Sequence, residues 1–401
     1  MIKKVLFTWE LGAGLGHLSP IYSVAKKFHS KGYEIWIASQ FLDNVHSVFT
    51  DIPVHVIQGP TNFNTEKNNP IICYADILYN VGYSDGKELT VFIKSWKNIY
   101  QLVQPDIIVH DYSPTAMLAS REYECEKIYI GSTFSNLASI DIRKPEIQTP
   151  RFYHYLKSNQ SLENFNQHSE VIERKVLNNI NMALNICKIG QISKITDIYS
   201  DFSKILYLTL PELDHYQRNE YSENTHFLVS SGIQTSTIVN WPDDEKSIKV
   251  FGYLKVKSYS KDALVSLLNA LKDKRFSSIL YLSGSFDINQ EMPNNIKIVN
   301  KPINISMMQQ QADILLCNSN LNSVIDFLMS GTPIGLLPLT PEQELLTALL
   351  ESKGYGFRLG KLSSEVIDQL LKAKNTKNNA LADKYSSIDF DKKLDELLIE
   401  Y

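Results

Sequence analysis

The chain has 401 residues, of which 43% are hydrophobic and 21% are charged, and this composition excludes wholesale disorder. Its formal net charge is −4 and no run of lysine and arginine stands out, so we expect no nucleic-acid partner. No stretch is long and apolar enough to span a bilayer, so we also expect no integral membrane association.

The first half of the chain alternates short apolar runs with helical patterns. Strands are predicted at residues 4–8, 34–38, 54–57, 107–109, 127–130 and 205–208, and helices at 18–31, 90–102 and 113–121. Strand and helix in repetition predict a parallel sheet with helices on both faces, a Rossmann-like domain over residues 1–230. The polar residues from about 150 to 202 are mostly helical in pattern, and we expect them to pack on this domain as a helical excursion.

A polar stretch at residues 231–247 is the predicted domain linker. The pattern then restarts, with strands predicted at 249–251, 278–282, 296–299, 314–317 and 334–337, and helices at 261–272, 305–311, 323–330 and 342–353. These elements predict a second doubly wound, Rossmann-like domain over residues 248–385. The tail, residues 386–401, is typical of an amphipathic helix, with an apolar side formed by Phe390, Leu394, Leu397 and Leu398.

The four cysteines are scattered along the chain and form no C-x-x-C pair. They are Cys73, Cys125, Cys187 and Cys317. This pattern is typical of reduced thiols, so we expect a cytoplasmic protein without a disulfide framework or a zinc site.

A glycine-rich loop follows the first predicted strand. Gly12, Gly14 and Gly16 stand at every second position, a spacing unlike the G-x-G-x-x-G of dinucleotide-binding loops. Glycine allows a positive φ and lets a ligand approach the backbone, so we assign Gly14 and Gly16 to an acceptor-side loop. His17 follows at the carboxyl edge of the sheet, where α/β folds bind ligands. Its neutral imidazole can take a proton from a hydroxyl group.

Asp111 ends a buried predicted strand and therefore faces the same crevice as His17. There it can hold His17 in one tautomer and stabilise the imidazolium, as the third residue of a catalytic triad does. Two structural alternatives remain open: His17 can simply hydrogen-bond the loop, and Asp111 can cap the helix that begins near Pro114. For either residue alone, the structural alternative is the stronger. His110 alternates to the other face of the strand, and we interpret it as structural.

A second loop of small polar residues follows the predicted strand at 314–317 and precedes a helix. The N-terminus of such a helix suits a diphosphate, to which Asn322 and Ser323 can add side-chain donors. Asp326, one turn inside the helix, can accept hydrogen bonds from ribose hydroxyls. The candidate donor site is completed by residues just past three strand ends, namely Ser285, Asn318, Ser319, Glu342 and Gln343. Each of these candidate donor-site residues, taken alone, can also be explained as a helix cap.

These residues resemble the GT-B nucleotide-sugar glycosyltransferases, specifically the branch that holds plant UDP-glycosyltransferases and bacterial macrolide and antibiotic glycosyltransferases. The resemblance covers nearly the entire chain. Residues 9–18, WELGAGLGHL, are similar to the bacterial opening, and residues 16–20 fit the shared motif G-H-x-x-P. Residues 211–216, PELDHY, are similar to a stretch of the bacterial members just before the linker.

The resemblance implies a GT-B fold, with two Rossmann-like domains facing across a cleft and a C-terminal helix that crosses back to pack on the first domain. It implies that the first domain binds the acceptor and the second binds the nucleotide sugar. It also implies that His17 is the general base and that Asp111 is its partner in a His–Asp dyad.

The donor loop departs from the family pattern. The family usually has His and Gly where Asn318 and Ser319 stand, and Asn320 also replaces a usual glycine. This departure supports an alternative from another class, a degenerate GT-B protein that acts as an auxiliary subunit. The argument against this alternative is that His17, Asp111 and Gln343 of the family pattern are all still present. A nucleotide-sugar epimerase is a third hypothesis, although we can assign none of the further acid or base residues that it needs.

The leading hypothesis is an inverting, metal-independent hexosyltransferase that moves a sugar from a UDP- or dTDP-sugar to a hydroxyl group of a small, natural-product-like acceptor. It needs no cofactor beyond this nucleotide-sugar co-substrate. Asp243 and Asp244 lie in the predicted linker, where we interpret them as a solvated charge cluster and not as a metal site. We expect acceptor loops within residues 59–87 and 132–170. Abundant Ile, Asn and Lys suggest a bacterial source, and a homodimer is an open option for the assembly.

Overall fold

The computed structural model describes most of the chain. The described residues are 2–12, 15–43, 45–61, 69–138, 149–152, 161–229, 237–242, 247–255, 261–283, 292–301 and 303–399. The chain divides into two compact units, which we call unit 1 (Met1–Ser231 with Phe390–Tyr401) and unit 2 (Gly232–Asp389). Within the described residues, no helix combines the length and the apolar character needed to cross a bilayer.

Unit 1 is built on a parallel sheet with the strand order β3-β2-β1-β4-β5-β6-β7. Its strands are β1 (Lys4–Trp9), β2 (Glu34–Ser39), β3 (His55–Gln58), β4 (Ile107–Asp111), β5 (Glu126–Gly131), β6 (Lys204–Tyr207) and β7 (Thr225–Phe227). The strands expected from apolar runs are all present, and their pairing is parallel as predicted. The edge strand β7 was not predicted, because its three residues are too few to show a period.

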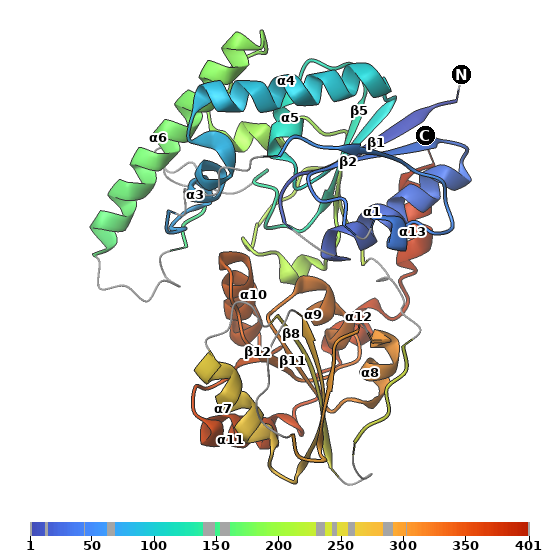
Figure 1. Cartoon of the computed structure of the whole chain (residues 1–401), viewed down its shortest axis with the longest axis vertical. Helices are drawn as coiled ribbons and strands as arrows, with labels where there is room; N and C mark the ends of the chain where they lie inside the picture. Colours follow the sequence, from blue (N-terminus) through green and yellow to red (C-terminus); the bar gives the residue numbers. More distant parts are fainter. Residues whose placement is uncertain are drawn as a thin grey trace. The chain divides into compact units, whose positions relative to one another are not determined.

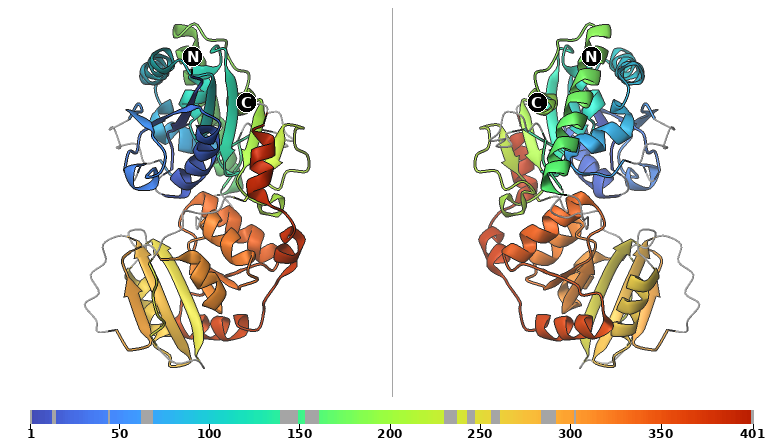
Figure 2. Two further views of the ribbon diagram at one scale, coloured as in Figure 1. Left: turned by 90° about the vertical axis from the view of Figure 1, so that its right-hand side faces the viewer. Right: turned by 90° about the vertical axis from the view of Figure 1, so that its left-hand side faces the viewer.

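Helices cover both faces of this sheet (Figure 2). They are α1 (Leu15–Ser30), α2 (Val45–Val48), α3 (Tyr74–Leu78), the π-helix η1 (Tyr79–Tyr83), α4 (Gly86–Val103), α5 (Pro114–Ser120), α6 (Leu162–Ile186) and the 3₁₀ helices η3 (Ile195–Tyr199) and η4 (Pro211–Leu213). Asp85 caps α4 by accepting from the backbone N–H groups of Lys87 and Glu88. The expected helical excursion is α6, which packs against α4 (Figure 1).

Unit 2 is built on a second parallel sheet, with the strand order β10-β9-β8-β11-β12-β13. Its elements are β8 (Ile248–Lys255), α7 (Lys261–Leu271), β9 (Phe276–Ser283), β10 (Ile296–Val299), α8 (Ile305–Gln311), β11 (Ile314–Cys317), α9 (Leu321–Leu328), β12 (Ile334–Leu336), α10 (Pro341–Ser352), β13 (Phe357–Arg358), α11 (Ser363–Ala373) and α12 (Ala380–Tyr385). The predicted strands and helices are confirmed. The unpredicted α11 packs on α7 and adds Val366 and Leu370 to the core.

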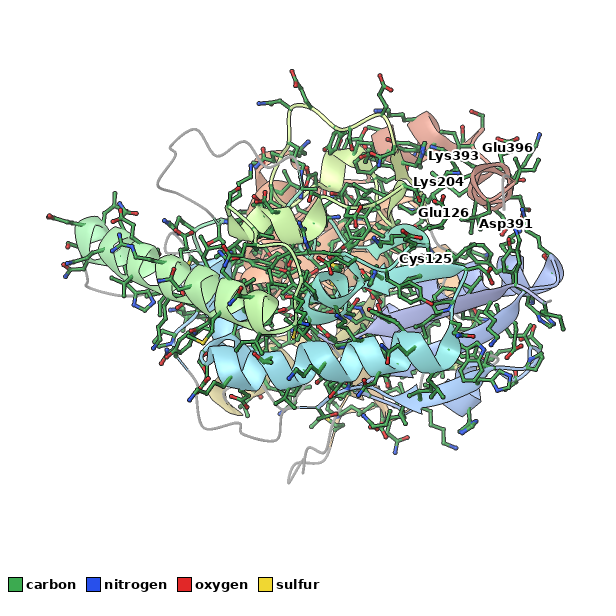
Figure 3. All side chains as sticks on the ribbon, turned by 90° about the horizontal axis from the view of Figure 1, so that it is seen from above. Cys125, Glu126, Lys204, Asp391, Lys393 and Glu396 are labelled. Carbon is green, nitrogen blue, oxygen red and sulfur yellow. The ribbon has the colours of Figure 1, made fainter. Side chains whose placement is uncertain are left out.

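The C-terminal helix α13 (Phe390–Leu397) packs on unit 1 beside α1 (Figure 1). Lys27 Nζ of α1 lies 2.7 Å from Oδ2 of Asp391 and 2.7 Å from Oδ2 of Asp395. Lys393 Nζ donates to the carbonyl oxygen of Phe227 in β7 at 3.1 Å. Figure 3 labels Asp391 and Lys393 on this helix, which the amphipathic pattern of the tail predicted.

Each sheet reverses its strand order once, between β1 and β4 in unit 1 and between β8 and β11 in unit 2. At these points Trp9 pairs with Asp111, and Tyr253 pairs with Cys317. Open parallel sheets bind ligands outside the carboxyl ends of their strands at such reversals. The fold therefore gives each unit one expected ligand position.

Candidate functional site

His17 and Asp111 meet at the strand reversal of unit 1. His17 lies in the first turn of α1, and Asp111 is the last residue of β4. Nδ1 of His17 and Oδ2 of Asp111 are 2.9 Å apart. The His17 side chain is 25% exposed and that of Asp111 is 3% exposed, so the carboxylate is buried while the imidazole can still be reached. The structure thus brings together the two residues that the sequence placed in one crevice.

The hydrogen bond to Asp111 determines which ring nitrogen of His17 can act as a base. A carboxylate accepts, so Nδ1 carries the proton and Nε2 keeps its lone pair. Nε2 points towards Gly12, where an added Cβ would lie 2.1 Å from it. Gly12 also has a φ of +81°, which favours glycine. Gly12 therefore leaves room for the nitrogen that is able to take up a proton.

The other two glycines of the loop differ from Gly12. An added Cβ on Gly16 would meet no atom within 4 Å, and Gly16 lies inside α1. Nothing in its surroundings requires a glycine. Gly14 lies outside the described residues.

The cap of α5 is provided by Glu10 and not by Asp111. The two oxygens of Glu10 accept from the backbone N–H groups of Thr115 at 2.8 Å and of Ala116 at 3.0 Å. Burial raises the pKa of Glu10 to about 7, and the two backbone donors oppose that rise. Glu10 was not predicted from the sequence, although a polar side chain directly after a buried strand was a usable signal. With the helix capped by Glu10, Asp111 is left to contact His17.

His110 lies in the core of unit 1. Its Nδ1 is 2.8 Å from Oγ1 of Thr8, and its Nε2 is 3.3 Å from Oγ of Ser120. The side chain is fully buried, and burial lowers its pKa to about 3. A histidine held neutral between two hydroxyl groups is a structural residue, as the alternation along the strand predicted.

Asn318 ties together the ends of three strands in unit 2. Its Oδ1 accepts from the backbone N–H of Lys255, at the end of β8, at 2.7 Å. Its Nδ2 donates to the carbonyl oxygen of Leu337, just after β12, at 2.9 Å. The residue is fully buried. The structure thus places this predicted donor-site amide between neighbouring backbones at the strand reversal.

Ser319 has the backbone of a glycine at the turn between β11 and α9. Its φ is +60°, in the left-handed region that few residues other than glycine adopt. The side chain is 2% exposed, and its Oγ is 2.6 Å from Oγ1 of Thr347 in α10. A serine therefore adopts here a left-handed turn that glycine would enter without strain.

Gln343 connects two loops at the same edge of unit 2. Its Nε2 donates to Oδ1 of Asn320 at 3.1 Å, and its Oε1 accepts from the backbone N–H of Leu339 at 2.8 Å. Asn320 is the N-cap residue of α9, but its side chain makes no capping hydrogen bond. The Gln343–Asn320 contact thus holds the loop before α10 against the loop before α9, beside the first turn of α9.

The remaining predicted donor residues lie on α9, on α10 or beyond the described residues. Asn322 is half-buried and Ser323 is buried in the first turn of α9, and Glu342 is half-buried in the first turn of α10. Burial raises the pKa of Asp326 to about 6. Ser285 lies outside the described residues, as do Asp243 and Asp244.

No protein-family model matches the sequence, and no curated protein matches it. Solved structures do match. The structure of the glycotransferase of kitacinnamycin has a TM-score of 0.74 at 13% identity, covering 100% of this chain and 99% of that one. The glycosyltransferase SnogD from Streptomyces nogalater has a TM-score of 0.64 at 14% identity, with coverages of 100% and 99%. The glycosyltransferase SsfS6 from Streptomyces sp. SF2575, complexed with thymidine diphosphate, has a TM-score of 0.63 at 12% identity, and both chains are covered completely. At such identities the likeness shows the fold, which is the predicted GT-B fold.

Proposed function

We propose that this protein is an inverting, metal-independent glycosyltransferase. It moves a sugar from a UDP- or dTDP-sugar to a hydroxyl group of a small, natural-product-like acceptor. Unit 1 binds the acceptor and unit 2 binds the nucleotide sugar. The observation that carries the proposal is the His17–Asp111 pair at the strand reversal of unit 1, with Nδ1 and Oδ2 2.9 Å apart. The similar structures support it, because those quoted above are described as sugar-transferring enzymes and one is complexed with thymidine diphosphate.

The proposed chemistry begins with proton transfer to His17. Nε2 takes the proton of the acceptor hydroxyl, and Asp111 stabilises the imidazolium that forms. The acceptor oxygen bonds to the anomeric carbon as the bond from that carbon to the diphosphate oxygen breaks. The nucleoside diphosphate leaves with the electron pair, and the anomeric configuration inverts. His17 then returns its proton to solvent.

In unit 2, the turn before α9 is the proposed cradle for the leaving diphosphate. The first backbone N–H groups of a helix attract anions, and Asn322 and Ser323 stand in that first turn. The left-handed backbone at Ser319 supports this role, because it keeps the path that a glycine would give the loop. Glu342 and Gln343 are the proposed contacts for sugar hydroxyls, and Asp326 is the proposed contact for the ribose.

One observation favours a second candidate, an auxiliary subunit without transferase activity. The Asn318 side chain is fully buried, and its amide oxygen and nitrogen each hydrogen-bond to a neighbouring backbone, so it is engaged in holding the strand ends together. Losing one charged-site donor costs about 1.5 to 3 kcal/mol of binding free energy. A donor site weakened by that amount can still function, which is why we rank this candidate second.

Calorimetric titration of the purified protein with UDP, dTDP and their glucose conjugates tests the proposal. We expect one nucleotide to bind, and its base then selects the donor for an acceptor screen. No binding of any of the four by the folded protein would support the auxiliary subunit.

Once a donor has been identified, the variant His17→Ala tests whether His17 is the general base. We expect kcat/KM for transfer to fall roughly 100- to 10,000-fold, while nucleotide affinity stays the same. His46→Ala, which changes an exposed histidine of α2, is the matched control and leaves both unchanged. Unchanged transfer by His17→Ala would show that the base is another residue.

A further inference from the structure

Two aromatic rings stack on the imidazole of His17. The ring centroids of Trp9 and His17 are 5.3 Å apart with an interplanar angle of 23°. Those of Tyr112 and His17 are 6.3 Å apart with an angle of 27°. Trp9 is the last residue of β1 and Tyr112 directly follows β4, so the two strands at the reversal each supply one ring. We call Trp9 and Tyr112 the aromatic pair.

Both rings are buried, and hydrogen bonds hold the Trp9 ring and the Tyr112 backbone in place. Trp9 is 1% exposed, and its Nε1 donates to the carbonyl oxygen of Leu11 at 2.8 Å. Tyr112 is 8% exposed, and its carbonyl oxygen accepts from the backbone N–H of Leu11 at 3.0 Å. The aromatic pair and the glycine-rich loop therefore share one hydrogen-bonded framework through Leu11.

The backbone at Tyr112 is strained in a way that serves His17. Its φ is +42°, a left-handed conformation that a bulky residue adopts only where its surroundings enforce it. Consecutive residues of a strand point to opposite faces. The left-handed turn at Tyr112 breaks this alternation, so the Asp111 carboxylate and the Tyr112 ring both reach the same imidazole.

We propose that Trp9 and Tyr112 are positioning residues that fix the plane of the His17 ring and stabilise its protonated form. An aromatic ring has a negative face, which attracts a cation stacked on it. During sugar transfer the imidazolium forms as the acceptor loses its proton, so this attraction is stronger after the proton transfer than before it. Among the described residues, the Asp111 carboxylate lies along the Nδ1 edge of the imidazole, and the titratable Tyr112 contributes its ring to the stack. The consequence for turnover rests on the proposed function, whereas the effect on His17 itself does not.

The test is an NMR titration of the His17 ring in the full-length protein without substrate. Tyr112→Leu removes the aromatic face, and Tyr112→Phe keeps it while removing the hydroxyl group. We expect the leucine variant to lower the proton affinity of His17 by roughly 3- to 10-fold and the phenylalanine variant to leave it nearly unchanged. If Tyr112→Leu does not fold, Trp9→Phe provides the same test, with a smaller fall because the Phe face is less negative.

The sign of the change in the proton affinity of His17 decides whether the proposal holds. Removing a ring also admits water to the imidazole, and hydration favours the charged form. A rise in proton affinity, or no change in any variant, would overturn the proposal. The aromatic pair would then only pack against His17 and would not stabilise its charge. For the active enzyme, the acid limb of the kcat/KM profile of Tyr112→Leu moves to lower pH together with the titration. If no transfer can be measured at all, the NMR result still stands, so failure of the proposed function is separable from failure of this inference.

Discussion

At the scale of the residue, Gly12 controls the space beside Nε2 of His17, the nitrogen proposed to act as the base. Gly12→Ala would place a Cβ 2.1 Å from Nε2 and would force alanine to a φ of +81°. Both effects push the imidazole and the loop apart. We expect kcat/KM for sugar transfer to fall about 100-fold or more, since a shift of about 1 Å at a reacting group has that effect. Steady-state transfer assays on a variant shown by circular dichroism to be folded provide the measurement.

Gly16→Ala is the matched control in the same loop. Its Cβ would meet no atom within 4 Å, and alanine suits a helix better than glycine does. We expect transfer to fall far less than in Gly12→Ala and the free energy of unfolding to rise by about 0.5 to 1 kcal/mol. Transfer that survives in Gly12→Ala, or that is lost equally in both variants, would contradict the assignment of Gly12.

The sequence predicted His17 and Asp111 because both lie at carboxyl ends of neighbouring strands, and that edge is determined by topology. It did not predict the stacking of Trp9 and Tyr112 on His17, because this arrangement depends on a left-handed turn at a tyrosine. A pattern of apolar and polar residues assumes regular strand alternation and carries no sign of such a turn. Glu10 was missed for a different reason, since only Asp111 was considered as the cap of α5, although Glu10 also directly follows a buried strand.

At the scale of the element, the turn between β11 and α9 combines backbone strain with a buried hydroxyl pair. Ser319→Gly relieves a left-handed conformation that costs roughly 1 to 2 kcal/mol. It also leaves the buried Thr347 hydroxyl without its partner at 2.6 Å, which costs about 1 to 3 kcal/mol. We expect the two effects to offset each other, so that the unfolding free energy measured in urea changes little.

The double variant Ser319→Gly with Thr347→Val separates these two effects. It removes both hydroxyl groups and keeps the shape of Thr347, so only the relief of strain remains. We expect it to be about 1 kcal/mol more stable than Ser319→Gly alone. If the two variants are equally stable, the Ser319–Thr347 contact makes no net contribution to stability.

Periodicity predicted most strands and helices of both units, since their apolar residues follow the period of each element. It missed β7 and β13, and the helices α2, α3, η1 and η4, all of which are too short to show a period. It also missed the helices α11 and α12, whose polar residues conceal their buried ones. At the donor loop it predicted that Asn318 and Ser319 follow a strand. It could not predict that both side chains turn inwards, because that depends on the neighbouring strand ends and on α10.

At the scale of the whole molecule, buried titratable groups make the two units respond oppositely to acid. In unit 1, burial lowers the pKa of His110 to about 3 and that of His215 to about 4, whereas both titrate near 6.5 in an unfolded chain. The unfolded chain therefore binds more protons below pH 6.5, and unit 1 loses stability as the pH falls. Glu10, with its pKa raised to about 7, opposes one of the two histidines over the same range. In unit 2, burial raises the pKa of Asp326 to about 6, so this unit gains stability as the pH falls from 6 towards 4.

Hydrogen exchange measured separately for the slowest amides of each unit, at pH 6.5 and at pH 5, tests this balance. Burial lowers the pKa of His110 and His215, and also that of His226, and together these shifts outweigh that of Glu10. Unit 1 should therefore lose roughly 1 kcal/mol of unfolding free energy per pH unit, while unit 2 loses none. His110→Gln keeps a hydrogen-bonding side chain between Thr8 and Ser120 but removes one titrating group. With one titrating histidine fewer, the unfolding free energy of unit 1 should fall less steeply with decreasing pH than in the unchanged protein, even if the variant is less stable at every pH. A slope that stays the same in His110→Gln would mean that His110 is protonated in the folded protein, and that the hydroxyl groups around it hold a charge in the core.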